Sequence, residues 1–363
     1  MKVAILGAGG VALGYAAHLA ERGHRPVVWS PSGAGTKDLV GLALRLSGIL
    51  DGDRAVDVAQ GVEEAVADAA AVVVALPANG HRAVIDAAVP HLRDGQTVIV
   101  SAQLSFSASY CAMRLQERGI AAPVVAWATT ALLGRRTGPN AVTIGGLRDM
   151  LEMAVLPAAA GVPSLALCKD LFGERFRLVD DVVAIALSNL NPPIHMASAL
   201  CNLTRIEKAE WWGNYDGITP AVARLIEALD AERLGLAEHC GVMVRSAEEH
   251  YRLTFGFAPG LSIAEMAAAV HARRKGPPGP TSLDTRFVTE DVPFGIVPLI
   301  ELGRWLGMDL PLHAAGARLL SALYGRDLAA DNDLLPLVDL AGVLSGIPLG
   351  GADCKRPAGP STP

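Results

Sequence analysis

The sequence predicts an α/β fold, in which a Rossmann-type, doubly wound parallel sheet is followed by a second, all-α domain. Apolar runs of strand length alternate with helical stretches up to about residue 144, an order typical of parallel strands with helices on both faces. From about Asp181 onward the apolar spacing is helical. We expect a dinucleotide-binding domain at 1–180, a helical substrate domain at 181–348 and a flexible tail at 349–363.

The chain opens with a strand at 3–6, a glycine turn, a helix and a second strand at 26–29. Gly7 permits the tight turn, Gly9 lets the backbone approach a pyrophosphate, and Ala12 allows close helix–strand packing. The helix N-terminus beyond the turn offers unpaired N–H groups to the anion. We therefore expect a dinucleotide here, rather than a glycine-rich turn without a ligand, bound by Gly7, Gly9, Gly10 and Val11.

The alternation continues through the first half. Strands are expected at 55–58, 71–76, 97–101, 123–128 and 141–144, the last of the sheet, with helices at 61–67, 81–92 and 107–118. In such sheets ligands lie beyond the carboxyl ends of the strands. Leu76 and Pro77, which end one buried strand, are therefore further candidates for cofactor binding.

The loop after the second strand bears on the choice of nicotinamide cofactor. An NAD enzyme usually carries Asp or Glu there, which accepts a hydrogen bond from the ribose 2′-OH. This chain has no carboxylate at that point, and four residues could instead bind a 2′-phosphate: Ser30, Ser32, Thr36 and Lys37. We favour NADP. The absence of an arginine from the loop keeps NAD open, and the serines could equally be turn residues.

The second half begins with a stretch, 182–204, that carries no Asp, Glu, Lys or Arg. A membrane span would leave its Asn and His side chains without partners in hydrocarbon, so we expect two buried helices broken at the double proline 192–193. Asn191 would cap the second helix, with Pro192 at its first position. His195 follows in the first turn and could act as a general acid or base, or could equally be a core histidine. A later helix is expected at 221–240, with Thr219 as its N-cap.

Composition narrows the class of protein further. The chain has 363 residues, 51% of them hydrophobic and 19% charged, as expected of a globular protein. A net charge of −6 with one compact basic run, 273–275, argues against a nucleic-acid partner. Five widely spaced cysteines without metal-ligand spacing predict reduced thiols and no metal site. No secretory signal is apparent, so we expect a cytoplasmic protein without a membrane partner.

Three segments of the second half resemble the octopine/nopaline (opine) dehydrogenase family. Ser-Asn-Leu-Asn-Pro-Pro-Ile-His at 188–195 is similar to the family's active-site segment. Tyr-Asp-Gly-Ile-Thr-Pro at 215–220, with 225–233, is similar to the turn and long helix that come next. Arg-Phe-Val-Thr-Glu-Asp-Val-Pro-Phe-Gly at 286–295 resembles the second active-site segment. The similarity runs from the glycine turn to about residue 312.

The resemblance implies a Rossmann domain joined to an all-α domain, with the substrate cleft between them. Members of the family use NADH or NADPH to condense the amine of an amino acid with a 2-oxo acid such as pyruvate, which yields an N-(carboxyalkyl) amino acid. Carried over by residue, His195 is the catalytic acid and base, Asp291 its carboxylate partner, Asn191 a substrate contact and Arg286 a clamp for a substrate carboxylate. Without the resemblance, Arg286 and Asp291 would be interpreted as surface charges.

Two other functions fit parts of the pattern. A ketopantoate reductase-like enzyme, or another 2-oxo acid or hydroxy acid dehydrogenase, would share the first domain but rely on a catalytic lysine, and Lys208 is the only lysine near the Asn191 helix. A non-catalytic NAD(P)-sensing protein would bind cofactor without turnover. The pairing of His195 with Asp291 favours the opine class. The expected partners are the amino acid, the 2-oxo acid and a second copy of the chain, in a homodimer.

Overall fold

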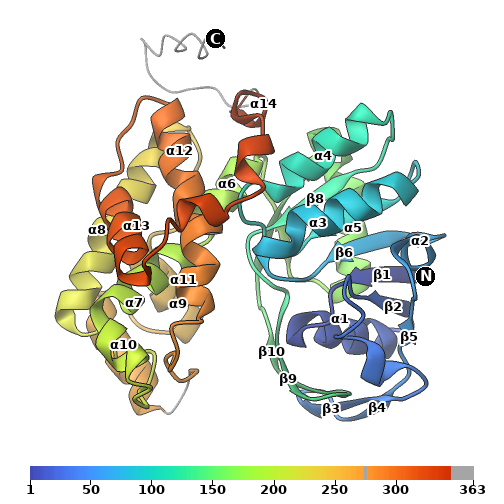
Figure 1. The fold of residues 1–363 in the computed structure, drawn as a ribbon, viewed down its shortest axis with the longest axis horizontal. Coiled ribbons are helices and arrows are strands. Elements are labelled where there is room, and N and C mark those ends of the chain that lie inside the picture. Colours follow the sequence, from blue (N-terminus) through green and yellow to red (C-terminus); the bar gives the residue numbers. More distant parts are fainter. Residues whose placement is uncertain (274–275, 345–363) are drawn as a thin grey trace. The chain divides into compact units, whose positions relative to one another are not determined.

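The computed structural model of the chain describes residues 1–273 and 276–344 (Figure 1). The expected tail at 349–363, Cys354 and the basic pair Arg274 and Lys275 lie outside the described residues. The chain divides into two compact units, residues 1–186 with 336–339, and residues 187–335 with the segment from 340 onward. The division falls within helix α6 (Val182–Ser188).

An eight-stranded sheet forms the centre of the first unit, in the order β12-β11-β8-β7-β6-β1-β2-β5. The six strands from β8 to β5 are parallel and follow the order of a dinucleotide-binding sheet, which confirms the predicted Rossmann topology. Their apolar runs are buried, as in parallel sheets covered on both faces. The strands are β1 (Lys2–Leu6), β2 (Arg25–Trp29), β5 (Asp57–Val58), β6 (Ala71–Val74), β7 (Thr97–Val100), β8 (Val124–Trp127), β11 (Leu151–Leu156) and β12 (Phe176–Leu178).

Two details of this sheet differ from the sequence prediction. The strand at 141–144 is not the last of the sheet, which instead ends with β11, antiparallel to β8, and β12. The strand expected at 55–58 is reduced to β5, because only residues 57 and 58 pair with β2, and residues 52–54 form a strand of another sheet. The helices of the unit are α1 (Gly10–Glu21), α2 (Val62–Val66), α3 (His81–Ala88), α4 (Ser107–Glu117) and α5 (Gly161–Phe172).

A second, four-stranded sheet, which the sequence did not predict, packs on α1. Its order is β4-β3-β10-β9, with β3 (Leu44–Gly48), β4 (Gly52–Arg54), β9 (Leu132–Gly138) and β10 (Ala141–Leu147). Gly10 and Gly14 lie one turn apart on the face of α1 that meets β9. A Cβ at Gly10 would lie 2.5 Å from Gly134 O, and one at Gly14 would lie 2.7 Å from a methyl of Leu132. Small residues at these positions thus let β9 reach the start of the helix.

The second unit is helical, as predicted, and its core includes Met196, Ile226, Leu229, Met266 and Leu320. Its helices are α7 (Asn191–Glu207), α8 (Pro220–His239), α9 (Ala247–Phe255), α10 (Ile263–Ala272), α11 (Arg286–Thr289), α12 (Val297–Trp305), α13 (Pro311–Tyr324) and α14 (Leu340–Leu344), with a π-helical turn at Val292–Ile296. Thr219 stands at the N-cap position of α8, as predicted, but its side chain makes no cap hydrogen bond.

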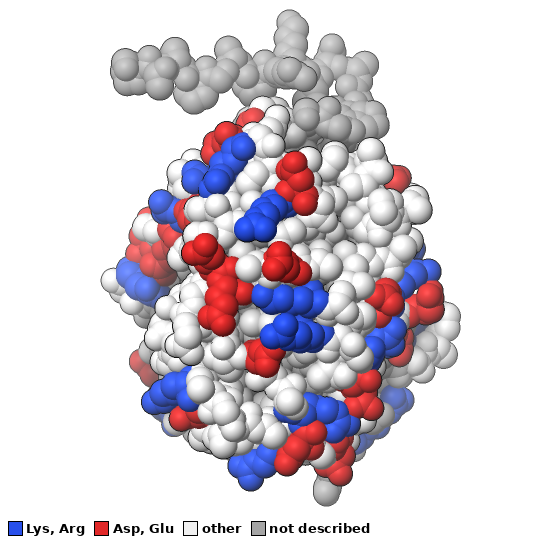
Figure 2. Space-filling view, turned by 90° about the vertical axis from the view of Figure 1, so that its right-hand side faces the viewer, with Lys and Arg blue, Asp and Glu red and all other residues white. Residues whose placement is uncertain are grey.

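Charged side chains of both signs are interspersed on the face of the molecule drawn in Figure 2, with uncharged areas between them. Among the residues that the structure describes, no helix combines the length and apolar character needed to cross a bilayer.

Candidate active site

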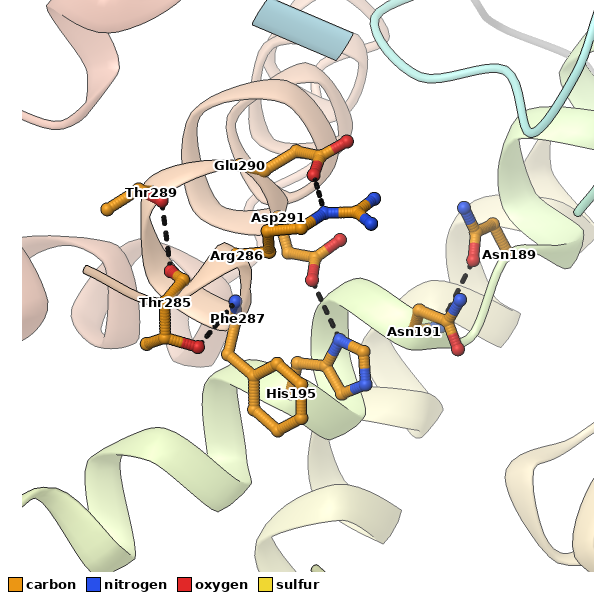
Figure 3. Close-up of polar contacts among 9 residues, drawn as sticks. All are labelled: Asn189, Asn191, His195, Thr285, Arg286, Phe287, Thr289, Glu290 and Asp291. Atoms are coloured by element: carbon orange, nitrogen blue, oxygen red, sulfur yellow. Dashed lines mark hydrogen bonds and ion pairs between the residues drawn. The ribbon is translucent and has the colours of Figure 1, made fainter. Parts of the chain in front are cut away.

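The helical unit brings His195 and Asp291 together (Figure 3). His195 Nδ1 lies 2.7 Å from Asp291 Oδ2, and the two side chains are 22% and 12% exposed. An ionised carboxylate can only accept, so Nδ1 carries the proton and donates it to Asp291. His195 Nε2 is then the unprotonated ring nitrogen, and it bonds to none of the described residues. The arrangement presents a basic nitrogen in a fixed orientation.

A third residue, Phe287, fixes the plane of the imidazole. Its ring stacks on that of His195 with centroids 3.7 Å apart and planes 6° apart (Figure 3). Phe287 belongs to α11, which is capped by Thr285, whose Oγ1 accepts from Phe287 N–H at 3.3 Å. Asp291 thus holds the edge of the imidazole and Phe287 covers one face. Sequence reasoning missed Phe287, although it lies between Arg286 and Asp291 in the segment that was singled out.

The start of α7 positions His195, but its capping differs from the prediction. The helix breaks at residues 189–190, ahead of the double proline, and Leu190 stands at the N-cap position. Asn191 is the first helical residue and not the cap, so that prediction was wrong. Asn189 Oδ1 instead accepts from Asn191 N–H at 3.1 Å. The side chain of Asn191 is exposed as a result, while Asn189 is buried.

A buried ion pair holds the chain that leads into this site. Arg233 is fully buried and donates to Asp230 Oδ1 from Nε at 2.8 Å and from Nη2 at 2.6 Å. It also donates to the carbonyl of Leu187, near the end of α6. Asp230 Oδ2 in turn accepts from Ala247 N–H at 2.7 Å. Helix α8 is thereby tied to the segment just before Asn189 and Asn191.

Arg286 occupies an exposed position on α11. Its side chain is 73% exposed and forms an ion pair with Glu290, one turn further along and only 8% exposed (Figure 3). The guanidinium therefore has a carboxylate partner within its own segment. Its role as a clamp for a substrate carboxylate stays a prediction.

The glycine turn of the first unit fits a dinucleotide on steric and electrostatic grounds. Gly7 has φ +140°, and a Cβ there would collide with the carbonyl of Ala75, so the turn requires glycine. Gly9 is the extended N-cap of α1, and a Cβ there would meet nothing within 4 Å. Neither a side-chain cap nor an acidic residue satisfies the first turn of α1. Free N–H groups and the positive end of the helix dipole thus lie beside open space, as a pyrophosphate requires.

The loop after β2 uses two of its four candidate residues for its own structure. Ser32 Oγ accepts from Ala34 N–H at 3.3 Å, and the buried Thr36 donates from Oγ1 to Gly33 O at 3.2 Å. Ser30 is partly exposed and Lys37 is exposed. An arginine from outside the loop also reaches it, because Arg136 Nη1 donates to Gly35 O at 2.7 Å. No local motif in the sequence revealed that contact.

A buried histidine holds the backbone beyond β6, where Leu76 and Pro77 lie. Burial lowers the pKa of His81 to about 4, so its imidazole is neutral at physiological pH. A carbonyl can only accept, so Nε2–H donates to Leu76 O at 3.1 Å. Nδ1 then accepts from the Ser107 hydroxyl at 3.0 Å. His81 is a second residue that sequence reasoning missed.

Comparison with known proteins matches both units of the chain. The model of the family described as NAD/NADP octopine/nopaline dehydrogenase, alpha-helical domain, matches residues 178–324, which include Asn191, His195, Arg286 and Asp291. That of the NAD-dependent glycerol-3-phosphate dehydrogenase N-terminus matches residues 2–104, which include the glycine turn.

Two relatives are similar in sequence over more than nine tenths of this chain. An opine dehydrogenase of Arthrobacter sp. (strain 1C) is 30% identical over 346 residues, 94% of this chain and 95% of that protein. The vitopine synthase of Allorhizobium ampelinum is 24% identical, over 91% of this chain and 95% of that protein.

Solved structures show the same fold. An octopine dehydrogenase with NADH and L-arginine has a TM-score of 0.78 at 17% identity, over 95% of this chain and 98% of that chain. A yersinopine dehydrogenase with bound NADP+ has a TM-score of 0.70 at 16% identity, over 95% and 96% of the two chains.

Proposed function

The chain belongs to the octopine/nopaline dehydrogenase family, and from this we propose that His195 is the catalytic acid and base of an opine dehydrogenase. The protein is an NAD(P)-dependent oxidoreductase acting on CH–NH donors. It condenses the amine of an amino acid with the carbonyl carbon of a 2-oxo acid and reduces the product to a secondary amine. Family membership favours this reaction over that of a ketopantoate reductase-like or other 2-oxo acid dehydrogenase, and over a sensor without turnover.

The single observation that carries the proposed role of His195 is its bonding pattern. Nδ1 is tied to Asp291 at 2.7 Å, Phe287 covers one ring face, and Nε2 bonds to no described residue. A catalytic base needs this combination of a fixed ring and a free nitrogen. Asp291 fixes the tautomer and stabilises the imidazolium that forms when Nε2 takes a proton.

The reaction requires proton movements that one imidazole can carry out in sequence. Addition of the amine nitrogen to the carbonyl carbon removes a proton from nitrogen and protonates the carbonyl oxygen. Loss of water then needs a second proton on that oxygen. An ammonium group supplies both, because two of its three protons leave with the oxygen as water and the third stays on the iminium nitrogen. His195 Nε2 would accept each of the two protons from nitrogen in turn and pass it to the oxygen. A bound reduced nicotinamide would supply the hydride that converts the iminium into the secondary amine.

The remaining site residues would bind and orient the two substrates and the cofactor. Both substrates carry carboxylates, for which Arg286 is the proposed clamp, and Asn191 is a proposed substrate contact. Binding by Arg286 would exchange Glu290 for the substrate carboxylate, because the two now form an ion pair. For the cofactor we propose NADPH over NADH, bound at Gly7, Gly9, Gly10 and Val11, with Leu76 and Pro77 beyond β6 and Ser30, Ser32, Thr36 and Lys37 in the loop after β2.

Two broader assignments accompany this function. The free cysteines among the described residues, which include the exposed Cys201, support a reducing compartment such as the cytoplasm. A homodimer is supported by an apolar stripe on α13, where Leu312, Leu319 and Leu323 are 39%, 56% and 55% exposed at helical spacing. Light scattering of the purified chain measures its oligomeric state.

A substrate matrix tests the proposed reaction. The full chain is incubated with NADPH or NADH, each of a set of amino acids, and pyruvate or another 2-oxo acid. We expect cofactor oxidation only when both substrates are present, with a product whose mass is their sum less one oxygen atom. Oxidation with pyruvate alone at the same rate would instead identify a simple 2-oxo acid reductase.

A further inference from the structure

The four-stranded sheet brings Arg136 to the cofactor turn of the first unit. Along β9 the residues alternate, and Arg136 lies on the partly buried side whereas Arg135 is exposed. Arg136 Nη1 donates to Ala8 O at 3.0 Å and to Gly35 O at 2.7 Å. One guanidinium nitrogen therefore joins the glycine turn after β1 to the loop after β2.

The hydrogen bonds of this guanidinium to described residues are all made with backbone carbonyls. Its other acceptors are Gly138 O, at 3.1 Å from Nε, and Pro139 O, which accepts from Nη2. These contacts use four of the five N–H donors of an arginine, and one on Nη2 remains. Carbonyl dipoles leave the net charge of Arg136 uncompensated. The first carboxylate after β2 in the chain is that of Asp38, which follows Lys37 in the short turn Lys37–Leu39.

Ala8, Ser30 and Gly35 converge at the same point. A Cβ built on Gly35 would lie 2.7 Å from Ala8 Cβ and 3.3 Å from Ser30 Oγ. In a dinucleotide-binding fold the residue that follows the second strand faces the 2′ position of the adenine ribose. Here that residue is Ser30, and Arg136 is bonded to the carbonyl of its neighbour in space, Gly35, so a positive charge lies near the position where an NAD enzyme would have a carboxylate.

We propose that Arg136 forms, with Ser30, the subsite for the 2′-phosphate of NADPH and so determines cofactor preference. The inference rests on the proposed function, which places a dinucleotide at the glycine turn. It supplies the arginine that the loop after β2 lacks, from a strand more than a hundred residues later in the chain. Arg136 can offer a phosphate its positive charge and the one N–H of Nη2 that no carbonyl accepts from, and a hydrogen bond to a charged group of this kind is a strong one.

The competing explanation is that Arg136 only holds the loop against the turn. A structural clasp of this kind would support NADPH and NADH alike, because both cofactors share every part except the 2′-phosphate. A phosphate ligand would affect NADPH alone. The ratio of the two dissociation constants therefore separates the explanations, whereas activity by itself does not.

The experiment titrates the full chain, without substrates, with NADPH and NADH and follows the fluorescence of the reduced nicotinamide. The variants are R136Q, which removes the charge, and R136K, which keeps the charge and loses the fork. The matched control is R135Q, because Arg135 is the adjacent residue on the exposed face of β9 and the substitution removes the same charge. Adenosine 2′,5′-bisphosphate and AMP serve as probes that lack the nicotinamide.

We expect wild type to bind NADPH more tightly than NADH. R136Q should weaken NADPH by about tenfold or more and change NADH by less than about twofold, with R136K between wild type and R136Q and R135Q like wild type. The bisphosphate should follow NADPH, and AMP should follow NADH. Equal weakening of both cofactors in R136Q, or a wild type that does not prefer NADPH, would overturn the proposal.

Failure of this inference and failure of the proposed reaction give different results. If the wild type condenses its substrates with NADH and R136Q does not change the binding of either cofactor, the proposed reaction is upheld and the 2′-phosphate subsite is refuted. If the NADPH affinity depends on Arg136 but no condensation product forms, the subsite is upheld and the proposed reaction is refuted.

Discussion

Replacement of Asp291 by Asn tests whether the carboxylate acts through His195. The substitution keeps the size of the side chain and removes its charge. If the amide presents its NH2 group to the ring, Nδ1 must become an acceptor and the proton must move to Nε2. If it presents its oxygen, the bond to Nδ1–H survives but the imidazolium loses its counter-charge. Both outcomes weaken His195 as a base.

The size of the effect follows from the geometry of the pair. His195 Nδ1 and Asp291 Oδ2 are 2.7 Å apart, and the side chains are 22% and 12% exposed, so solvent screens the pair only slightly. A hydrogen bond to a charged group of this kind is worth about 1.5–3 kcal/mol. If that energy is realised in the transition state, kcat falls roughly 10- to 150-fold in Asp291→Asn.

The assay combines steady-state rates with a mutant cycle. The condensation rate is measured for wild type, Asp291→Asn, His195→Gln and the double variant, and the NADPH dissociation constant is measured separately. Because Asp291 is expected to act only through His195, the double variant should be no slower than His195→Gln alone. Cofactor affinity should hardly change, since the glycine turn belongs to the other unit.

Two results would refute this reasoning. A kcat for Asp291→Asn within about twofold of wild type would mean that the carboxylate contributes almost nothing to catalysis. Multiplicative losses in the double variant would mean that Asp291 acts independently of His195, for example on the substrate.

Three further predictions follow from individual contacts. Phe287→Leu should lower kcat by about two- to tenfold without weakening NADPH binding, because the stacked ring is lost. Phe287→Tyr, which keeps an aromatic ring, should keep the wild-type kcat. Equal rates for both variants would contradict a role for stacking. Gly10→Ala should lower the free energy of unfolding by about 1–3 kcal/mol, because the added Cβ would meet the backbone of β9. Gly9→Ala should leave the free energy of unfolding unchanged and weaken cofactor binding. Thermal unfolding and NADPH titration of both variants separate the two effects. Burial holds the pKa of His81 near 4, below its unfolded value, so the native state binds fewer protons than the unfolded state. The free energy of unfolding should therefore fall as the pH drops from about 6.5 toward 4, by about 2 kcal/mol at pH near 5 from this residue. Chemical unfolding should show a shallower pH dependence in His81→Gln, and an unchanged dependence would count against the assignment.

The parallel sheet could be predicted because its strands have a strong local signal. Apart from Lys2 at the start of β1, the residues of β1, β6, β7 and β8 are buried, and apart from Lys2 and Thr97 they are apolar. Helix α8 was equally predictable, since Thr219 and Pro220 mark its start. The contact between His195 and Asp291 was predicted through the resemblance of two segments. Nothing in local spacing says that residues 195 and 291 meet.

What the sequence did not reveal depends on how elements pack. The stacking of Phe287 on His195 requires α11 to lie against α7. Helix α7 begins one residue earlier than the prolines suggest, so the side chain of Asn189, and not that of Asn191, accepts a hydrogen bond at its start. Both are consequences of tertiary structure at positions whose residue types were already in view. The chemistry of the site was therefore easier to predict than its support.

Cofactor preference shows the same limit at greater distance along the chain. The loop after β2 lacks both a carboxylate and an arginine, and a reading of that loop alone leaves NADPH and NADH both open. The charge that we propose as deciding is on β9, whose alternating exposed residues give a weak strand signal. The place of β9 is set by pairing with β10, where Arg136 lies opposite Val142 next to a register shift. β10 pairs in turn with β3, which directly follows the loop region. A short sheet made of strands from two distant parts of the chain, 44–54 and 132–147, can thus place an arginine beside the loop after β2, and a local motif cannot show it.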